Sequence, residues 1–150
     1  MNSFIDVERA LTEDDLRKFE RAFNIQMPQS IKQHYLKYNG GYPERTVFYS
    51  EEDDIEYTVN YFFSIGGNDG MKVEETMSLL SDEKVFPKWL VPLADDAGGD
   101  LFAYSIREGE EGAIYYYSHD FDYGENPEEH VTKLADNIEV FLESLLPEEE

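Results

Sequence analysis

The spacing of the apolar residues changes at Pro43, and this change limits the folds that the chain can adopt. Before Pro43, apolar residues recur every three to four positions, as in Leu16, Phe19 and Phe23, which is the period of an amphipathic helix. After Pro43, apolar and polar residues alternate, which is the period of a half-buried strand. Helical segments followed by a run of strands with short connections indicate an α+β fold and not alternating βαβ units.

Signals at the helix ends predict where the first two helices lie. Thr12 is expected to cap the first helix, with acidic residues at 13–15 in the first turn, where the helix dipole favours anions. The second helix is expected to begin at Met27-Pro28, since proline is tolerated at the start of a helix. It should end at residues 39–41, Asn-Gly-Gly, because these residues accept the left-handed backbone of a helix end.

Two more helices are expected later in the chain. A short one should cover residues 73–80. At the C-terminal end, Asp136 and Glu139 are predicted to form a capping pair. The buried stripe of this last helix is then Ile138, Phe141, Leu142 and Leu145.

Five segments have the composition or the period of strands. In residues 55–65 the apolar side chains fall on one face and the polar ones on the other, after an acidic turn at 51–54. No linker or internal repeat interrupts the chain. We therefore expect a single domain over residues 1–150, with a core of about 11–146, in which an antiparallel-dominated sheet packs against the N-terminal and C-terminal helices. The predicted strands are 46–50, 55–65, 89–93, 101–106 and 113–118.

Negative charge is concentrated in the second half of the chain. The sequence has 34 acidic and 12 basic residues, a formal net charge of −22. Residues 1–40 are balanced, whereas residues 95–150 contain 17 acidic residues and only two basic ones, Arg107 and Lys133. Such a field repels nucleic acid and anionic membranes and attracts cationic protein surfaces. The alternative interpretation is that the charge serves solubility alone.

The sequence has no feature that predicts secretion or membrane insertion. Its first residues lack the basic and apolar regions of a signal peptide, and no apolar run approaches the roughly 18 residues of a membrane span. There are no cysteines, so no disulfides or thiolate metal sites can form. We therefore expect a cytoplasmic protein.

Candidate catalytic groups are few. The histidines have structural interpretations: His34 at the surface or boundary of the second helix, His119 at a strand end, and His130 in a solvated acidic stretch. No nucleophile elbow or phosphate-binding glycine motif is present. The segment from Asp120 superficially resembles a calcium loop but has Gly124, Glu125 and Val131 where an EF-hand needs a ligand, a glycine and a glutamate. Weak calcium binding by its carboxylates is left open, but no catalytic residue, resident metal or cofactor is predicted.

Asp95, Asp96 and Asp100 flank the pair Gly98-Gly99. Paired carboxylates can serve acid–base or two-metal chemistry, but the same residues also suit an acidic turn between two strands. Tyr115, Tyr116 and Tyr117 form an aromatic strand whose carboxylate surroundings would repel a nucleic acid. One face of this strand is expected to join the core, and the other to suit protein contact.

Four segments, taken in order, resemble the SUKH superfamily, which includes the fungal Smi/Knr cell-wall regulators and many bacterial toxin-immunity proteins. The resemblance covers about residues 11–146 and departs from the family pattern at Met27, where leucine is usual, and at Tyr117, where tryptophan is common. The second departure could alter a binding surface. The matching segments are Met27-Pro28 with the helix end at 35–43, residues 91–100, residues 113–120, and residues 134–138 with Phe141-Leu142.

The resemblance implies helices packed on an antiparallel-dominated sheet and, in bacteria, an immunity protein that neutralises a secreted toxin, often a nuclease, by direct binding. It carries over no catalytic residues. We expect the acidic surface to occupy the basic active site of a toxin domain, while the oligomeric state is left open. The alternatives are a regulatory or scaffold module of the Smi/Knr type and a metal-dependent enzyme. The expected contact residues are Asp95, Asp96, Asp100, Asp120, Asp122, Tyr123 and Glu125, with Tyr117 as an aromatic anchor.

Overall fold

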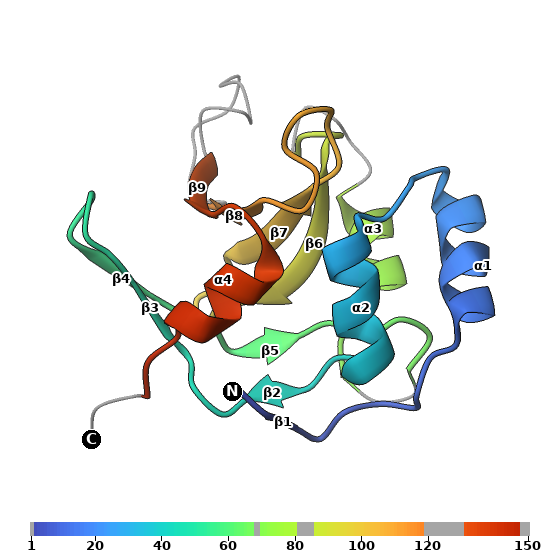
Figure 1. The fold of residues 1–150 in the computed structure, drawn as a ribbon, viewed down its shortest axis with the longest axis horizontal. Helices are drawn as coiled ribbons and strands as arrows, with labels where there is room; N and C mark the ends of the chain where they lie inside the picture. Colours follow the sequence, from blue (N-terminus) through green and yellow to red (C-terminus); the bar gives the residue numbers. More distant parts are fainter. Residues whose placement is uncertain (1, 68–69, 81–85, 119–130, 148–150) are drawn as a thin grey trace.

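Five antiparallel strands form the central sheet, in the spatial order β5-β6-β7-β8-β9 (Figure 1). The computed structural model describes residues 2–67, 70–80, 86–118 and 131–147. Two further pairs of strands, β1-β2 and β3-β4, are also antiparallel. The strands are β1 Phe4–Ile5, β2 Tyr42–Pro43, β3 Val47–Ser50, β4 Ile55–Thr58, β5 Tyr61–Phe62, β6 Leu90–Asp95, β7 Leu101–Ser105, β8 Ile114–Tyr117 and β9 Val131–Ala135.

The helices are α1 Glu13–Phe23, α2 Gln29–Lys37, α3 Val73–Leu79 and α4 Ile138–Ser144. The expected cap of α1 is confirmed, because Thr12 accepts from the amide of Asp15 and the Asp15 carboxylate accepts from the amide of Thr12. None of the described helices combines the length and apolar character that a bilayer crossing requires. Helices and antiparallel sheets in one chain confirm the predicted α+β fold class.

Helices α2 and α4 lie side by side over one face of the sheet (Figure 1). On α4, the ring of Phe141 packs against Phe102 of β7 and Phe48 of β3, with centroid distances of 5.7 and 5.4 Å. On α2, the buried Tyr35 donates to the carbonyl of Phe63 at 3.2 Å. These aromatic contacts place the core between the two helices and the sheet.

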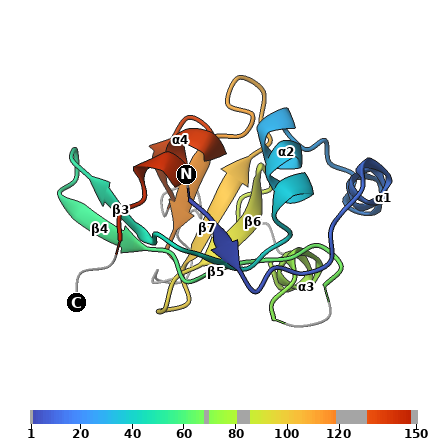
Figure 2. The same ribbon diagram turned by 60° about the horizontal axis from the view of Figure 1, so that its bottom comes forward.

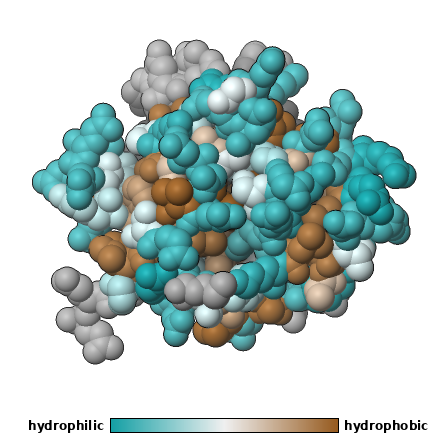
Figure 3. Space-filling model, in the orientation of Figure 1, coloured by the Kyte–Doolittle hydropathy of each residue, from teal (hydrophilic) through white to brown (hydrophobic). Residues whose placement is uncertain are grey.

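The β3–β4 hairpin projects from the end of the molecule opposite α1, as Figures 1 and 2 both show. Its base is held by Leu146, which exchanges two backbone hydrogen bonds with Val47 at 2.7 and 2.9 Å. The end of the chain beyond α4 therefore anchors this hairpin. Figure 3 shows that hydrophilic residues cover most of this side of the molecule, with hydrophobic residues in separate patches.

The single strand predicted over 55–65 is wrong, because the segment divides into β4 and β5. The amide of Val59 donates to Thr46 beside β3, whereas the next amide, of Asn60, donates to the carbonyl of Asp95 on β6. The chain thus passes from one sheet to the other at this point. Ser64, predicted to share the polar face, is fully buried as a result.

Other differences from the predictions concern short or capping elements. Strands β1, β2 and β9 were not predicted, because the first two have only two residues each and β9 carries no clear alternation. The cap of α4 is Asn137 and not Asp136: its side chain accepts from the amide of Val140 at 2.9 Å. His34, predicted at the surface or at the boundary of the core, is buried and only 7% exposed.

Candidate functional site

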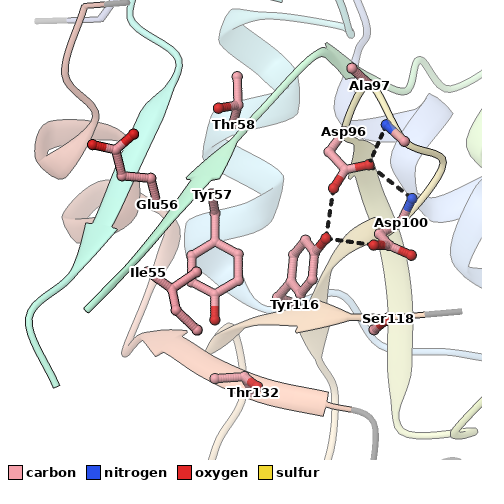
Figure 4. Close-up of a pocket in the computed structure, with 11 residues that line it drawn as sticks. Ile55, Glu56, Tyr57, Thr58, Asp96, Ala97, Asp100, Tyr116, Ser118 and Thr132 are labelled. Carbon is pink, nitrogen blue, oxygen red and sulfur yellow. Dashed lines mark hydrogen bonds between the residues drawn. The ribbon is translucent and has the colours of Figure 1, made fainter. Parts of the chain in front are cut away.

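An open groove of about 550 Å³ separates the β3–β4 hairpin from the turn that joins β6 to β7 (Figure 4). Strand β4 forms one wall, and the turn forms the other. Among the described residues, every charged side chain in the lining is acidic. The lining residues are Ile55, Glu56, Tyr57, Thr58, Asp96, Ala97, Gly98, Asp100, Tyr116, Ser118 and Thr132.

The carboxylate of Asp96 is held in place by the turn that it closes. Its Oδ1 accepts from the backbone amides of Gly98 and Asp100, both at 2.9 Å. Its own amide donates to the carbonyl of Asp100 at 2.9 Å. Gly99 has a φ of +92°, in the left-handed region that favours glycine. The expected acidic turn between two strands is therefore confirmed, and its sequence fixes where the acid points.

Tyr116 joins the two carboxylates of this turn (Figure 4). Its hydroxyl oxygen lies 2.6 Å from Oδ2 of Asp96 and 2.7 Å from Oδ2 of Asp100. A phenol has one hydrogen, so it donates to only one of these oxygens at a time. Burial, together with the two carboxylates, raises the pKa of Tyr116 well above its usual value, which keeps the proton on the hydroxyl.

Tyr57 of β4 completes the floor of the groove. Its ring centroid lies 4.6 Å from that of Tyr116, and the two planes meet at 56°. Tyr57 is buried, and burial raises its pKa. The groove therefore combines an aromatic floor with acidic walls, an arrangement that suits the alkyl stem and the charged end of a lysine or arginine.

The two basic residues after residue 94 do not line the groove. The Nε of Arg107 donates to Oε1 of Glu110 at 2.8 Å, and its guanidinium lies 3.7 Å above the Trp89 ring. Lys133 lies 3.3 Å from Oε2 of the same Glu110. Hydrogen bonds from Arg107 and Tyr115 lower the pKa of Glu110 to about 2. Both cations are thus engaged in a separate cluster, and neither offsets the charge of the groove.

Of the three aspartates predicted around Gly98-Gly99, the structure brings Asp96 and Asp100 together in the groove. Asp95 does not line it, because its Oδ1 accepts from the side chain of Asn60 at 3.2 Å and from the amide of Tyr61 at 3.1 Å. Burial raises the pKa of Asp95. Asp95 therefore connects β5 to β6, and its predicted role as a contact residue is not supported by its position.

Tyr117 is 1% exposed and packs edge-on against Phe86, with a centroid distance of 4.9 Å. The side chain predicted as the aromatic anchor thus belongs to the core. Side chains alternate along β8, so the neighbouring Tyr116 points to the opposite face and reaches the groove. On β8 it is therefore Tyr116, and not Tyr117, that reaches the groove, and the use of this face for protein contact stays a prediction.

The remaining predicted contact residues, Asp120, Asp122, Tyr123 and Glu125, lie outside the described residues. Glu56, Tyr57 and Thr132, which come from β4 and β9, were not predicted as site residues. The alternation in residues 55–58 did indicate that Glu56 is exposed, but only tertiary packing places β4 opposite the turn. Within the described part of the chain, no three histidine, aspartate or glutamate side chains are placed to hold a metal ion.

The structure is thus a small α+β domain that carries an acidic groove with an aromatic floor. The chain belongs to the SMI1 / KNR4 family (SUKH-1), whose model matches residues 10–144. It is also similar to the SPbeta prophage-derived uncharacterized protein YokK of Bacillus subtilis (strain 168). The two are 26% identical over 157 aligned positions, which cover 91% of this chain and 76% of that protein.

Proposed function

We propose that this protein is an immunity protein that binds a basic toxin domain through the acidic groove and has no catalytic activity of its own. The observation that carries the proposal is the acidic character of the groove among the described residues. Glu56, Asp96 and Asp100 line it, none of the described lining residues is basic, and Arg107 and Lys133 are paired with Glu110. A cationic side chain entering the groove would meet complementary negative charge.

The proposed mechanism is occupation of the partner's substrate surface. A nuclease must present lysine and arginine to the phosphates of its substrate, and an acidic domain can cover these groups in the same way. Asp120, Asp122, Tyr123 and Glu125 remain in the proposal as further contacts. The prophage origin of the similar protein favours this bacterial role over a regulatory module of the Smi/Knr type.

Co-purification with the product of the adjacent gene, followed by association kinetics, tests the proposal. The triple variant E56Q/D96N/D100N removes the charge of the groove and keeps its size. We expect slower association and a weaker salt dependence for this variant than for the unchanged protein. Equal association rates at low salt would exclude the groove as the binding surface. Inhibition of the partner's activity separates an immunity protein from a regulatory or scaffold module.

A further inference from the structure

Among the described residues, no backbone group pairs with the outer hydrogen-bonding edge of strand β4, which borders the groove. In the β3–β4 hairpin, Tyr49 is opposite Glu56 and Val47 is opposite Thr58. The amide of Val59 donates to the carbonyl of Thr46, one step along the same register. Because successive residues of a strand direct their backbone groups to opposite sides, those of Glu56 and Thr58 point away from β3.

The partners of Val47 confirm this assignment. Val47 lies opposite Thr58, yet its amide and carbonyl bond to Leu146 on the far side of the hairpin. The outer edge of β3 is therefore occupied at Val47. The outer groups of Glu56 and Thr58 have no backbone partner among the described residues, and both residues are exposed. An unpaired, exposed strand edge is a template for a further strand.

The position of this edge indicates what it would accept. Beyond Thr58, the amide of Asn60 already bonds to Asp95 on β6. The free stretch therefore lies between the hairpin turn and β6, along the wall of the groove that faces Asp96 and Asp100. An incoming strand would run past these carboxylates, and complementarity then requires basic side chains on it.

We propose that an extended, lysine- or arginine-bearing segment of the partner protein adds to β4 as a third strand of the β3–β4 sheet. This inference rests on the proposed function and specifies how the partner is held. Backbone hydrogen bonds to Glu56 and Thr58 supply sequence-independent affinity, and the acidic groove selects a cationic segment. A globular basic surface without an extended segment would not bind in this way.

Synthetic peptides test the proposal against the full-length protein. The probe is an octapeptide of alternating lysine and threonine, titrated at low salt while the protein's amides are followed by NMR. In a strand, all lysine amides face one edge and all threonine amides the other. Two matched peptides, N-methylated either at every lysine or at every threonine, keep the charge and differ only in which edge is blocked.

Strand addition predicts that one methylated peptide binds about tenfold or more weakly than the parent, whereas the other retains most of its affinity. Equal binding of both would overturn strand addition. If both methylated peptides bind equally and E56Q/D96N/D100N weakens their binding, the proposed function stands although strand addition is excluded. Two results would contradict both strand addition and the proposed function. In one, the parent peptide does not bind; in the other, E56Q/D96N/D100N binds it as tightly as the unchanged protein does.

Hydrogen exchange gives a second readout without mutation. The amides of Glu56 and Thr58 should become protected when the parent peptide binds, while that of Tyr57, which faces β3, should change little. A matched pair of variants then acts on the protein side. Thr58→Pro removes only an outward amide, so the ladder to β3 survives, and Thr58→Val keeps the amide. We expect at least about tenfold weaker peptide binding for Thr58→Pro alone; unchanged exchange at Glu56 and Thr58 would refute the proposal.

Discussion

The hydroxyl of Tyr116 donates to Oδ2 of Asp96 across 2.6 Å and so connects strand β8 to the turn between β6 and β7. The other oxygen of Asp96 is occupied by two amides of the turn. One carboxylate thus has two roles, since it organises the turn and also supplies negative charge to the groove. Substitutions that separate these roles give the first prediction.

Asp96→Asn should keep the turn and remove the charge, whereas Asp96→Ala should lose both. The amide oxygen of asparagine can still accept from Gly98 and Asp100, and its NH2 group can donate to the Tyr116 oxygen. We expect urea unfolding to show a loss of about 1–3 kcal/mol for the alanine variant and under about 1 kcal/mol for asparagine. Both should bind the lysine–threonine peptide more weakly. Equal destabilisation would mean that the turn depends on the charge itself.

We expect His34 to make the protein sensitive to mild acid. It lies between the rings of Phe4 and Phe62, and its Nε2 has no hydrogen-bond partner among the described residues. Burial, with a smaller contribution from Lys37, lowers its pKa from 6.5 to about 4. Above pH 6.5 the imidazole is neutral in both states. Between pH 6.5 and 4 only the unfolded chain binds the proton, so the free energy of unfolding falls as the pH falls.

The full loss attributable to His34 is about 3 kcal/mol when the pH reaches 4. His34→Phe should abolish this part, since phenylalanine does not titrate and suits the aromatic surroundings. Urea unfolding of both proteins at pH 7 and at pH 4.5 measures the difference, while the many carboxylates contribute equally to each. Parallel pH profiles for the two proteins would contradict the assignment.

Asn39 fastens three separate segments by its side chain. Its Nδ2 donates to the carbonyls of Arg9 and Ile65, both at 3.0 Å, and its Oδ1 accepts from the amide of Ile65 at 2.8 Å. Asn39→Ala leaves these groups unpaired at a residue that is 3% exposed, so we expect a loss of about 2–4 kcal/mol in urea unfolding. Asn60→Ala at an exposed site is the matched control and should cost under about 1 kcal/mol. Similar losses for both would contradict the fastening role.

Glu110 should remain ionised to unusually low pH. Its pKa of about 2 is caused first by the hydrogen bond from Arg107, then by that from Tyr115. Carboxyl carbon NMR should therefore show its titration near pH 2, and Arg107→Met should move the pKa upward toward its ordinary value of 4.5. Arg17→Met, which affects only an exposed pair with Asp14 on α1, is the control and should leave Glu110 unchanged.

Local signals predicted the helices well because their information is local. Thr12 and Asp15 cap α1 through residues three positions apart, and the predicted 73–80 helix corresponds to α3 at Val73–Leu79. The turn around Gly99 was equally predictable from sequence, since a left-handed φ favours glycine. The family resemblance also covered nearly the same residues as the matching model.

The site was only half predictable from sequence. Asp96 and Asp100 were identified because they flank the same glycine pair, and a short turn brings such neighbours together whatever the rest of the fold does. Asp95 directly precedes Asp96, but its side chain does not point into the groove. Its carboxylate accepts instead from the amide of Tyr61. Tyr117 was selected and Tyr116 was not, because composition cannot tell which face of β8 meets the core.

The sequence by itself determined the α+β class, the approximate positions of the helices, the acidic turn and the sign of the charge, since each depends on residue type and short spacing. Only the tertiary structure decided that β4 lies opposite that turn, that Tyr116 bridges Asp96 and Asp100, and that Arg107 and Lys133 are held by Glu110. These relationships join residues distant in the chain. They depend on how strands and helices pack together, and that packing is set by the whole core and not by any one segment.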